Sequence, residues 1–506
     1  MCLIHTSYFK KMLDTIYSPT DFRKNGHDLV NLLADYLENA QSDAPDKTIP
    51  FVAPEESLAF WQADLAQSPT NDPLDFFKKV VAQSTKLHNP RYVGHQVAVP
   101  APLAALSGLV VNMMNNGMAV YEMGLVSNPL ERIVTDWLSA HFGLKNDLNG
   151  QNALARDEAT EGGGILTSGG TLANLTALLA ARAVKSPNDD WTDGTTEKLA
   201  LLVSEEAHYC VDRAVRIMGW GEAGIIKVPT NDLFQMKTEL LDAYFEKAEA
   251  EGRRVIAVVG SACSTSTGSY DDLEAIADFA ERRQIWFHVD GAHGGAAVVS
   301  KKYGDLLRGA HRADSIIVDF HKMMMIPALV TAVLFRNPAH GYQTFHQKAQ
   351  YLWENADSQD WFNSGKRTFE CTKLMMSVKV YALLRTYGEA VFEAYIDKTH
   401  DLATEFADIL RGSKNFELGV APQSNIVCFR FLGFNSESNK SLSVNDLNRL
   451  NSFIRQEILA RGDFYIVQTT LRGEVFLRVS LMNPLTTITH LTELLTEIEA
   501  IASKIL

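Results

Sequence analysis

Apolar positions along the chain change their spacing twice, and the changes divide it into three parts. In roughly the first 85 residues they recur at helical spacing, as in the stripe of Leu29, Leu32, Leu33, Tyr36 and Leu37, which predicts amphipathic helices. From about residue 90 to 340, amphipathic stretches alternate with short runs rich in Val and Ile, at 199–203, 255–260, 285–289 and 315–318. Because these runs show little polar alternation, they predict strands buried on both faces of a mostly parallel sheet.

The rest of the chain predicts a smaller mixed domain. We expect a helix over 371–387, strands over 425–431 and 475–481, and a closing helix over 491–505. A polar connection that contains prolines, at 45–54, interrupts the N-terminal helices. The expected organisation is therefore an N-terminal helical arm over 1–85, a large α/β domain over 86–365 and a small C-terminal α+β domain over 366–506.

Composition narrows the class of protein. The 506 residues are too many for one core, and 46% hydrophobic with 21% charged residues is typical of globular domains. A net charge of −14 would repel nucleic-acid phosphates and anionic lipid, so we expect neither as a partner. Five scattered cysteines without a C-x-x-C spacing argue against zinc and against a disulfide framework. With no signal-peptide pattern and no apolar stretch long enough to span a bilayer, we expect a soluble cytoplasmic protein.

Three segments that follow predicted strands carry candidate chemistry. The first is a glycine-rich loop at 162–171, with sequence GGGILTSGGT, followed by an expected helix over 172–183. Glycines let a backbone approach a ligand closely, and the N–H groups of a helix start bind anions. The spacing fits neither a dinucleotide nor a Walker motif. By itself the segment is equally typical of an ordinary helix start.

The second and third segments supply a carboxylate and an amine. Asp290 ends the apolar run in FHVDGAHGG, and a buried carboxylate needs a cationic or hydrogen-bonding partner. Lys322 follows another strand in DFHK and precedes three methionines, and apolar surroundings lower the pKa of an amine, as a Schiff-base lysine requires. Alone, each is also explained as a turn carboxylate or a surface lysine. Together with the anion loop they predict a pyridoxal phosphate (PLP) site.

These motifs closely resemble those of the PLP-dependent group II amino-acid decarboxylases, a family that acts on glutamate, cysteine sulfinate, aspartate, diaminobutyrate and aromatic amino acids. The resemblance rests on TSGGTLAN at 167–174, HVDGAHGG at 288–295 and HKMM at 321–324, and it extends from about residue 90 to 484. It implies the aspartate-aminotransferase-like fold, known as PLP-dependent transferase fold type I. It also implies a homodimer, with active sites shared between the subunits and the N-terminal arm serving dimerisation.

The resemblance assigns roles position by position. Lys322 would form the Schiff base with PLP, Asp290 would hold the pyridine nitrogen protonated, and His208 would stack over the ring. The other expected cofactor contacts are Ser168, Gly169, Gly170 and Thr171 at the phosphate, together with Thr265, Ala292, Asp319 and His321. Arg478 would bind the substrate α-carboxylate, a task that suits a bidentate guanidinium. His95 and Gln96 are candidates for contact with the substrate side chain, although an ordinary polar loop explains them as well.

The sequence departs from the family at two places that matter. Many members have asparagine three residues before the lysine, where this chain has Asp319, so local hydrogen bonding should differ. Many also carry a loop tyrosine that returns a proton to the substrate carbon, and 352–373 contains none. Either His208 or water would supply that proton, or the loop would serve mainly to exclude water. Some relatives with phenylalanine there make aldehydes instead of amines.

Two segments bear on the substrate, and together they leave more than one substrate class open. The stretch NNGMAVYEM at 115–123 resembles the glutamate and cysteine sulfinate branch, whereas PRYVGHQ at 90–96 resembles the diamine branch about as well. We expect decarboxylation of an acidic aliphatic L-amino acid. The alternative is a diaminobutyrate or other diamino-acid decarboxylase, followed by an aromatic decarboxylase, an aldehyde synthase or a PLP aminotransferase. A non-catalytic binding protein is disfavoured because Lys322, Asp290 and His208 are all present.

Overall fold

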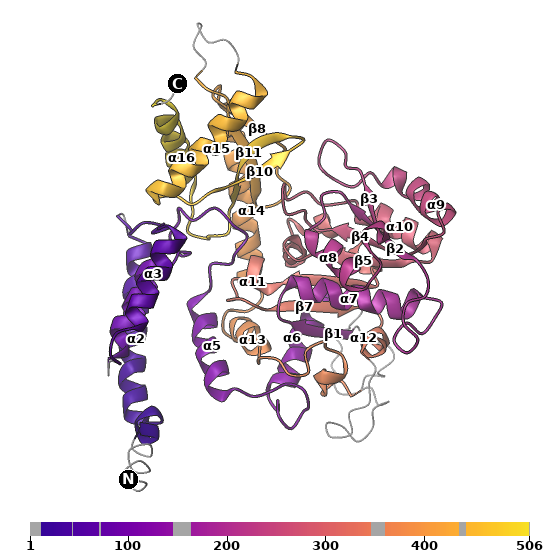
Figure 1. Ribbon diagram of the computed structural model, residues 1–506, viewed down its shortest axis with the longest axis horizontal. Helices are drawn as coiled ribbons and strands as arrows, with labels where there is room; N and C mark the ends of the chain where they lie inside the picture. Colours follow the sequence, from indigo (N-terminus) through magenta and orange to yellow (C-terminus); the bar gives the residue numbers. More distant parts are fainter. Residues whose placement is uncertain are drawn as a thin grey trace.

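Two sheets of different size organise the chain (Figure 1). The computed structural model describes residues 12–42, 44–69, 72–144, 163–345, 360–434 and 442–504. The larger sheet has seven strands in the order β1-β7-β6-β5-β4-β2-β3. They are β1 (Gly163–Thr167), β2 (Leu199–Ser204), β3 (Ile225–Val228), β4 (Arg254–Ser261), β5 (Trp286–Asp290), β6 (Ser315–Asp319) and β7 (Thr331–Phe335). Only β7 runs antiparallel to its neighbours, so the sheet is mostly parallel as predicted.

The four strands expected from apolar runs correspond to β2, β4, β5 and β6, each within one residue at either end. Every residue of β2, β5 and β6 is buried, which explains why these strands lack polar alternation. Helices cover both faces of the sheet. On one face lie α7 (Gly170–Lys185) and α8 (Tyr209–Ile217), and on the other α6 (Ser127–His141), α9 (Leu241–Ala250), α10 (Leu273–Arg283) and α13 (Ser377–Tyr387). The fold is the predicted α/β class.

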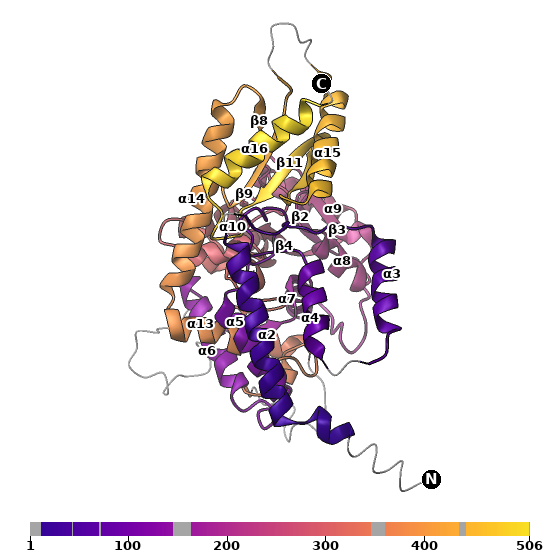
Figure 2. The same cartoon turned by 90° about the vertical axis from the view of Figure 1, so that its left-hand side faces the viewer.

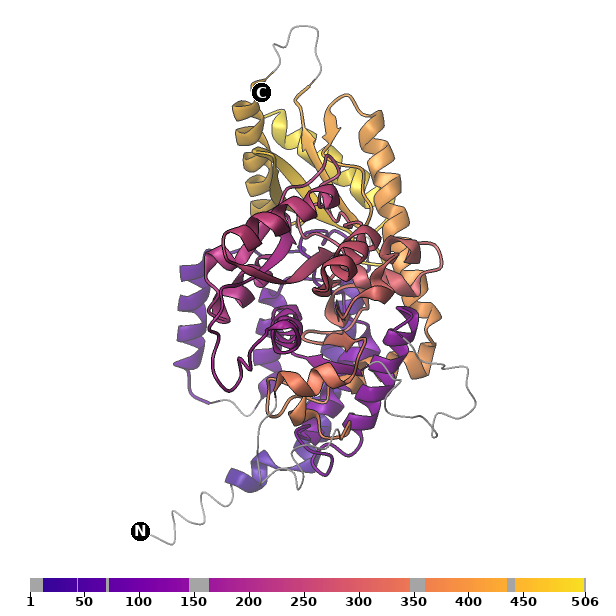
Figure 3. The same cartoon turned by 90° about the vertical axis from the view of Figure 1, so that its right-hand side faces the viewer.

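The C-terminal part forms a second layer of structure above the large domain (Figure 3). Its four antiparallel strands, in the order β10-β11-β9-β8, are β8 (Phe416–Leu418), β9 (Ile426–Phe431), β10 (Val467–Leu471) and β11 (Glu474–Ser480). The helices α14 (Ala390–Gly412), α15 (Val444–Arg461) and α16 (Ile488–Ala502) pack on this sheet around a core of their own. The strands expected at 425–431 and 475–481 and the closing helix are therefore confirmed.

The helix expected over 371–387 begins later, at Ser377. The preceding residues are held by side-chain contacts that a helix would not allow. Lys373 donates to the Glu131 carboxylate at 2.6 Å and to the Leu166 carbonyl at 2.7 Å, and the Thr372 hydroxyl accepts from the Met118 N–H. Because these partners lie far away in sequence, helical spacing of the apolar residues could not reveal them.

The N-terminal arm consists of α2 (Pro19–Ala40), α3 (Pro54–Leu65) and α4 (Pro73–Gln83), followed by α5 (Pro102–Met114) on the large domain. Each helix begins with a proline, whose fixed φ suits the first turn. Figure 2 shows α2, α4 and α3 over one face of the molecule, and α2 packs against α4. No helix among the described residues is long and apolar enough to cross a membrane.

The predicted stripe on α2 is only partly covered by the subunit itself. Leu29, Leu32, Tyr36 and Leu37 are half-buried, while Leu33 is 41% exposed. Further large apolar side chains are exposed on the same helices and on α5, among them Phe22, Val30, Leu58, Phe60, Leu65, Phe76, Leu109, Val110, Met113 and Met114. The arm thus presents an apolar surface that the described residues leave open to solvent.

Candidate active site

Four predicted site residues lie side by side because they follow neighbouring strands of the sheet. Lys322 follows β6, Asp290 ends β5, Thr265 follows β4 and His208 follows β2, and these four strands are adjacent in the order given. Ligands of open parallel sheets bind at the carboxyl ends of the strands, where these residues are. The structure therefore brings together the lysine, the carboxylate and the histidine that the sequence singled out.

The glycine loop is shaped as an anion cradle. Gly169 has φ +111°, a backbone conformation that disfavours side chains, and it precedes the sixteen-residue helix α7. A Cβ on Gly170 would lie 3.0 Å from the Asp319 carboxylate, so the position has no room for a larger residue. The first turn of α7, including the exposed Thr171, leaves free backbone N–H groups that favour a phosphate.

A buried ion pair fixes the strand that leads into this loop. Leu166 lies on β1, the edge strand of the sheet, and its outer N–H and carbonyl would otherwise lack strand partners. The Glu131 carboxylate accepts from the Leu166 N–H at 3.1 Å, and the Lys373 ammonium donates to its carbonyl. Glu131 and Lys373 pair with each other at 2.6 Å. The edge is thus closed by charged side chains in place of a further strand.

Ser168 is held differently from the expectation that it binds the phosphate. Its N–H and hydroxyl both donate to Glu370 Oε1, which lies in the segment after residue 360. The other carboxylate oxygen of Glu370 is buried and has no hydrogen-bond partner among the described residues. A protein carboxylate therefore occupies the donors of Ser168 in this structure, and sequence patterns gave no indication of it.

Asp290 is 7% exposed and is held by two donors. Its Oδ1 accepts from the Ala292 N–H at 3.2 Å, and its Oδ2 accepts from the Asn174 side-chain amide at 3.2 Å. Ala292 is half-buried, and its carbonyl accepts from the Asp319 N–H, which ties the turn to β6. The carboxylate therefore has a fixed direction at the strand end.

Lys322 has a carboxylate partner, and this corrects one expectation. Its Nζ lies 3.1 Å from Asp319 Oδ2, and Asp319 also accepts from the Thr331 hydroxyl. Burial alone would lower the pKa of the Lys322 ammonium, but the charges of Asp319 and Asp290 outweigh it and raise the pKa above the usual lysine value. The prediction of a lowered pKa from the neighbouring methionines was wrong, because the third residue before the lysine is an acid.

His208 caps the helix α8, and its Nδ1 accepts from the Cys210 N–H at 3.3 Å. Burial lowers the pKa of this imidazole; the Asp290 charge opposes the shift, and the Lys322 charge adds to it. A neutral ring with one nitrogen used as an acceptor carries its proton on Nε2. The neighbouring His321 accepts from the Val330 N–H through Nδ1, and its Nε2 lies 3.7 Å from Asp319.

The expected substrate-binding residues come from the small domain and from the segment after α4. Arg478 on β11 is 7% exposed and donates from Nη1 to the Thr265 carbonyl at 2.8 Å. Its Nε has no partner among the described residues, and none of their carboxylates pairs with it. The backbone of Ala98 donates to the His321 carbonyl, so the segment that bears His95 and Gln96 docks beside the lysine. The Gln96 side-chain nitrogen is buried and unpaired within the same described part of the chain.

Two site features were missed by sequence reasoning, and one expectation is not tested. Asn174 is buried on α7 and contacts Asp290, and Glu370 contacts Ser168, yet neither was given a role. A buried asparagine four residues after a helix start was the available signal for Asn174.

The loop without tyrosine falls partly on residues 346–359, which lie outside the described residues. Tyr351, directly before residue 352, also lies outside the described residues, so the absence of tyrosine holds for 352–373 alone.

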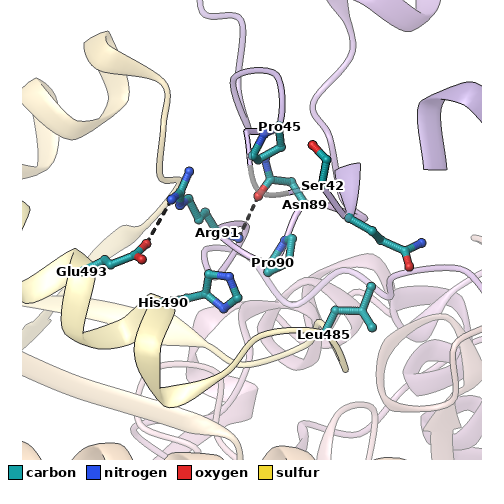
Figure 4. Close-up of a pocket in the computed structure, with 9 residues that line it drawn as sticks. Ser42, Pro45, Asn89, Pro90, Arg91, Leu485, His490 and Glu493 are labelled. Carbon is teal, nitrogen blue, oxygen red and sulfur yellow. Dashed lines mark hydrogen bonds and ion pairs between the residues drawn. The ribbon is translucent and has the colours of Figure 1, made fainter. Parts of the chain in front are cut away.

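A surface cavity of about 390 Å³ lies elsewhere, between the N-terminal segment and α16 (Figure 4). Arg91 and Glu493 pair across it at 3.0 Å, and His490 and Asn89 also line it. None of its lining residues is one of the predicted site residues. Because its one arginine is already paired with a carboxylate, the cavity does not offer an anion site.

Taken together, a lysine, a strand-end carboxylate and an anion cradle at adjoining strand ends define a fold type I PLP enzyme. Comparison with known proteins agrees. A family model described as the pyridoxal-dependent decarboxylase conserved domain matches residues 74–432. The chain belongs to this family, and it is a PLP-dependent amino-acid decarboxylase.

Relatives cover nearly the whole chain at low identity. An aromatic-L-amino-acid decarboxylase of Bacillus atrophaeus is 26% identical over 494 residues, which are 96% of this chain and 97% of the relative. An aspartate 1-decarboxylase of Aliivibrio fischeri is 28% identical and covers 88% of this chain and 86% of its own length. Another relative is named for L-2,4-diaminobutyrate. The names thus point to different substrates.

Among solved structures, mouse CSAD in its apo form superposes with a TM-score of 0.85 at 23% identity, covering 96% of this chain and 99% of that one. The fold type expected from the motifs is confirmed by this likeness.

The residues present fit PLP as the cofactor. Gly169 and Gly170 leave the cradle free of side chains, a buried carboxylate faces the same strand ends, and Lys322 supplies the amine. This donor set matches the three demands of the cofactor, which are an anion site, a partner for a protonated ring nitrogen and an imine-forming lysine.

Proposed function

We propose that this enzyme decarboxylates an acidic aliphatic L-amino acid, namely glutamate, aspartate or cysteine sulfinate, to the amine and CO₂. The observation that carries the choice of an acid is that two cations, Arg478 and Arg455, act on His95, the candidate contact for the substrate side chain. Arg478 itself is 7% exposed, lacks a carboxylate partner among the described residues and suits the α-carboxylate that every substrate carries. A buried cation without a counterion is costly, so a site that keeps one is suited to an anionic ligand.

The roles of the side chains follow from their positions. PLP, when bound, accepts the electron pair that remains when CO₂ leaves the substrate. Lys322 would hold the cofactor covalently through its Nζ. Asp290 keeps the proton on the ring nitrogen, and the fixed direction of its carboxylate suits that task. Arg478 would bind the α-carboxylate, and the neutral His208, with its proton on Nε2, would stack on the cofactor ring.

The charges around His95 favour an acidic side chain in the substrate. Burial lowers the pKa of His95, and the positive charges of Arg478 and Arg455 lower it further. Both charged groups that act on this imidazole are therefore cations. A second anionic group on the substrate would be attracted to this region, whereas the ammonium of a diamino acid would be repelled.

A diamino acid remains the second candidate because one carboxylate lies near the same strand end. Glu206, two residues before His208, is half-buried and accepts from the Ser266 hydroxyl next to Thr265. Glu206 would be the partner of a substrate ammonium. The two candidates thus assign specificity to different residues, Arg455 for an acidic substrate and Glu206 for a diamino acid.

CO₂ release from a panel of L-amino acids tests the proposal. The panel contains glutamate, aspartate, cysteine sulfinate, 2,4-diaminobutyrate and tryptophan, and we expect the highest kcat/KM with an acid. Arg455→Gln should lower kcat/KM about tenfold for that acid, roughly the 1.4 kcal/mol of one screened charge contact, and leave tryptophan unchanged. Arg449→Gln, on the same helix but 79% exposed, is the matched control. Preference for diaminobutyrate, lost in Glu206→Gln, would establish the second candidate instead.

We also propose that two copies of the chain form a homodimer through the arm and α5. The support is the group of exposed apolar side chains on α2 to α5. Single exposed apolar residues are normal on a monomer, whereas many on neighbouring helices indicate an interaction surface. Deleting residues 1–60 should yield aggregated protein or protein that holds little PLP, because obligate dimers often lack a stable monomer.

A point variant separates dimerisation from folding. Val110 on α5 is 54% exposed, and Val110→Glu should shift the protein from dimer to monomer in sizing with light scattering. Ile217 on α8 is 63% exposed, away from the arm, and Ile217→Glu should leave the dimer intact. Wild-type protein that runs as a monomer would refute the dimer, and a monomeric Val110→Glu variant that decarboxylates at the full rate would refute the shared site.

A further inference from the structure

A chain of buried polar groups connects the interior of the sheet with the Asp290 carboxylate. Trp286 Nε1 donates to Ser315 Oγ at 2.9 Å, and Ser315 Oγ lies 2.8 Å from His288 Nδ1. His288 Nε2 lies 2.8 Å from Asn174 Oδ1, and the Asn174 amide nitrogen donates to Asp290 Oδ2 at 3.2 Å. His288 and Ser315 are completely buried, and Asn174 is 1% exposed.

The chemistry of the end groups fixes the direction of the hydrogen bonds that Asn174 makes, and with them the proton on His288 Nε2. The Asp290 carboxylate and the Gly170 carbonyl can only accept, so the NH₂ group of Asn174 faces them and its oxygen faces His288. His288 therefore carries a proton on Nε2, and in the neutral ring Nδ1 accepts from the Ser315 hydroxyl. The Ser315 carbonyl, 3.2 Å from the same nitrogen, can only accept and would be a partner only for a protonated Nδ1. Trp286, which can only donate, supplies the remaining hydrogen bond to Ser315. Burial lowers the pKa of His288 to about 4, so the ring stays neutral as this arrangement requires.

Asn174 also joins three elements that each carry a predicted cofactor contact. Its amide nitrogen lies 3.1 Å from the Gly170 carbonyl in the anion cradle and 3.2 Å from the Cys210 sulfur in the first turn of α8. The backbone N–H of Cys210 in turn donates to His208. One amide group therefore sets the positions of the phosphate cradle, the ring-nitrogen partner and the stacking histidine relative to one another.

We propose that Asn174, oriented by His288, is a positioning residue that aims the Asp290 carboxylate at the cofactor ring nitrogen. The proposal rests on the role of Asp290 proposed above, and it holds for any amino-acid substrate. Without His288, the oxygen of Asn174 loses its donor and the amide is free to turn. A turned amide would place its oxygen against the carboxylate, which repels it and moves it out of line with the ring.

The experiment compares the binding of PLP with that of 1-deaza-PLP, in which carbon replaces the ring nitrogen. Wild-type protein should bind PLP more tightly, because only PLP can pair with Asp290. In Asn174→Ser and His288→Phe we expect this preference to fall about tenfold. His288→Gln has an amide that can donate to Asn174 and accept from Ser315. In this variant the preference for PLP should return to within about threefold of the wild-type value. Thr176→Val is the matched control, since Thr176 is buried on the same helix and its hydroxyl has no partner in the described structure.

The outcomes separate the possible failures. If wild-type protein and Asp290→Asn bind the two cofactors with the same ratio, the role of Asp290 is wrong, and with it this proposal. If wild-type protein prefers PLP and the Asn174 and His288 variants keep that preference while both affinities fall equally, the polar chain is only structural and the proposal is overturned. Should His288→Phe fail to fold, Asn174→Ser and Ser315→Ala give the same comparison at either end of the chain.

Discussion

The two sides of the proposed active site differ in how completely their polar groups are satisfied. On the ring side, Asp290 and Asn174 take part in a continuous set of buried hydrogen bonds. On the carboxylate side, Arg478 Nε and the Gln96 amide nitrogen are buried without partners among the described residues. Buried polar groups are nearly always paired in native proteins, so unpaired ones need an explanation.

The difference agrees with the ligand that we propose for each side. A resident cofactor needs a site that is complete before the substrate arrives, and fixed hydrogen bonds provide that preorganisation. A substrate enters and leaves in each turnover, so its site is left open and its polar groups are paired only while it is bound. Variants on the ring side should therefore change cofactor binding and kcat, whereas variants on the carboxylate side should change KM.

Lys322→Ala should have the largest effect and abolish turnover. Without the amine, borohydride should no longer fix the cofactor to the protein, as mass spectrometry of tryptic peptides would show. The absence of a covalent label is specific to this lysine, because Lys366 and Lys373 remain as internal controls. Reduced PLP attached to another lysine would show that the ring side is built around a different residue.

Asp290→Asn should lower kcat by about three orders of magnitude and leave KM nearly unchanged. Two opposite charges about 4 Å apart contribute roughly 4 kcal/mol at an effective dielectric constant of 20, and this contribution belongs to the transition state. Steady-state kinetics measures both constants, and circular dichroism checks that the fold persists. A kcat close to wild type would be incompatible with a charged partner for the ring nitrogen.

Arg478→Gln should raise KM about a hundredfold, the effect of losing a charged hydrogen bond of roughly 3 kcal/mol. The absorbance of the bound cofactor should stay the same, because Arg478 contacts Thr265 and not the ring side. Arg478→Lys keeps the positive charge but loses the two parallel donors of the guanidinium, so its KM should lie between those of wild type and Arg478→Gln. If kcat and the cofactor spectrum change while KM does not, the two sides of the site are not separate.

Sequence reasoning placed the ring-side residues at adjoining strand ends, as the structure has them, because they lie within short motifs at those ends. Asp290 and Lys322 each follow a run of fully buried residues, and such runs fix both the strand and the place where it ends. Burial on both faces is a local property, so it is visible in sequence. The strand at 331–335 was not foreseen although it too is buried, because no chemistry-bearing residue drew attention to it.

The contacts that the sequence could not show join residues distant along the chain. Glu370 meets Ser168 across 202 positions, and Lys373 meets Glu131 across 242. No periodicity records such a pairing. The wrong pKa direction for Lys322 has a different cause. The sequence shows Asp319 three residues before the lysine, but not that its carboxylate lies 3.1 Å from Lys322 Nζ.

Acid should weaken the fold through its buried histidines, of which His288 belongs to the ring side. Burial lowers the pKa of His288 and of His400 to about 4, below the value near 6.5 in an unfolded chain. As the pH falls below about 6.5, the unfolded state binds protons that the folded state does not, so stability is lost toward pH 4.

At pH 5 each of these histidines should lower the free energy of unfolding by about 2 kcal/mol. Asp271, whose pKa burial raises to about 6, opposes it in part because its folded form gains a proton in the same range. Urea unfolding of the apo protein between pH 7.5 and 5 measures how steeply the free energy of unfolding changes with pH. His400→Phe, outside the site, should reduce the pH dependence by about one proton; an unchanged slope would contradict the assignment.

Glu370→Gln should have the smallest effect and sharpen the contrast between the two sides. In this structure the Glu370 carboxylate holds both donors of Ser168, beside the cradle predicted for the phosphate. If phosphate binding requires these donors, the carboxylate must leave or accept a second anion nearby, and either costs free energy. Removing its charge while keeping its shape should tighten PLP binding about threefold, close to 0.7 kcal/mol. Fluorescence titration of the apo protein with PLP measures the change, and pyridoxal without phosphate is the control ligand, for which no change is expected. Equal tightening for both ligands would mean that Glu370 acts on the site as a whole, and weaker PLP binding would mean that the contact with Ser168 supports the cradle.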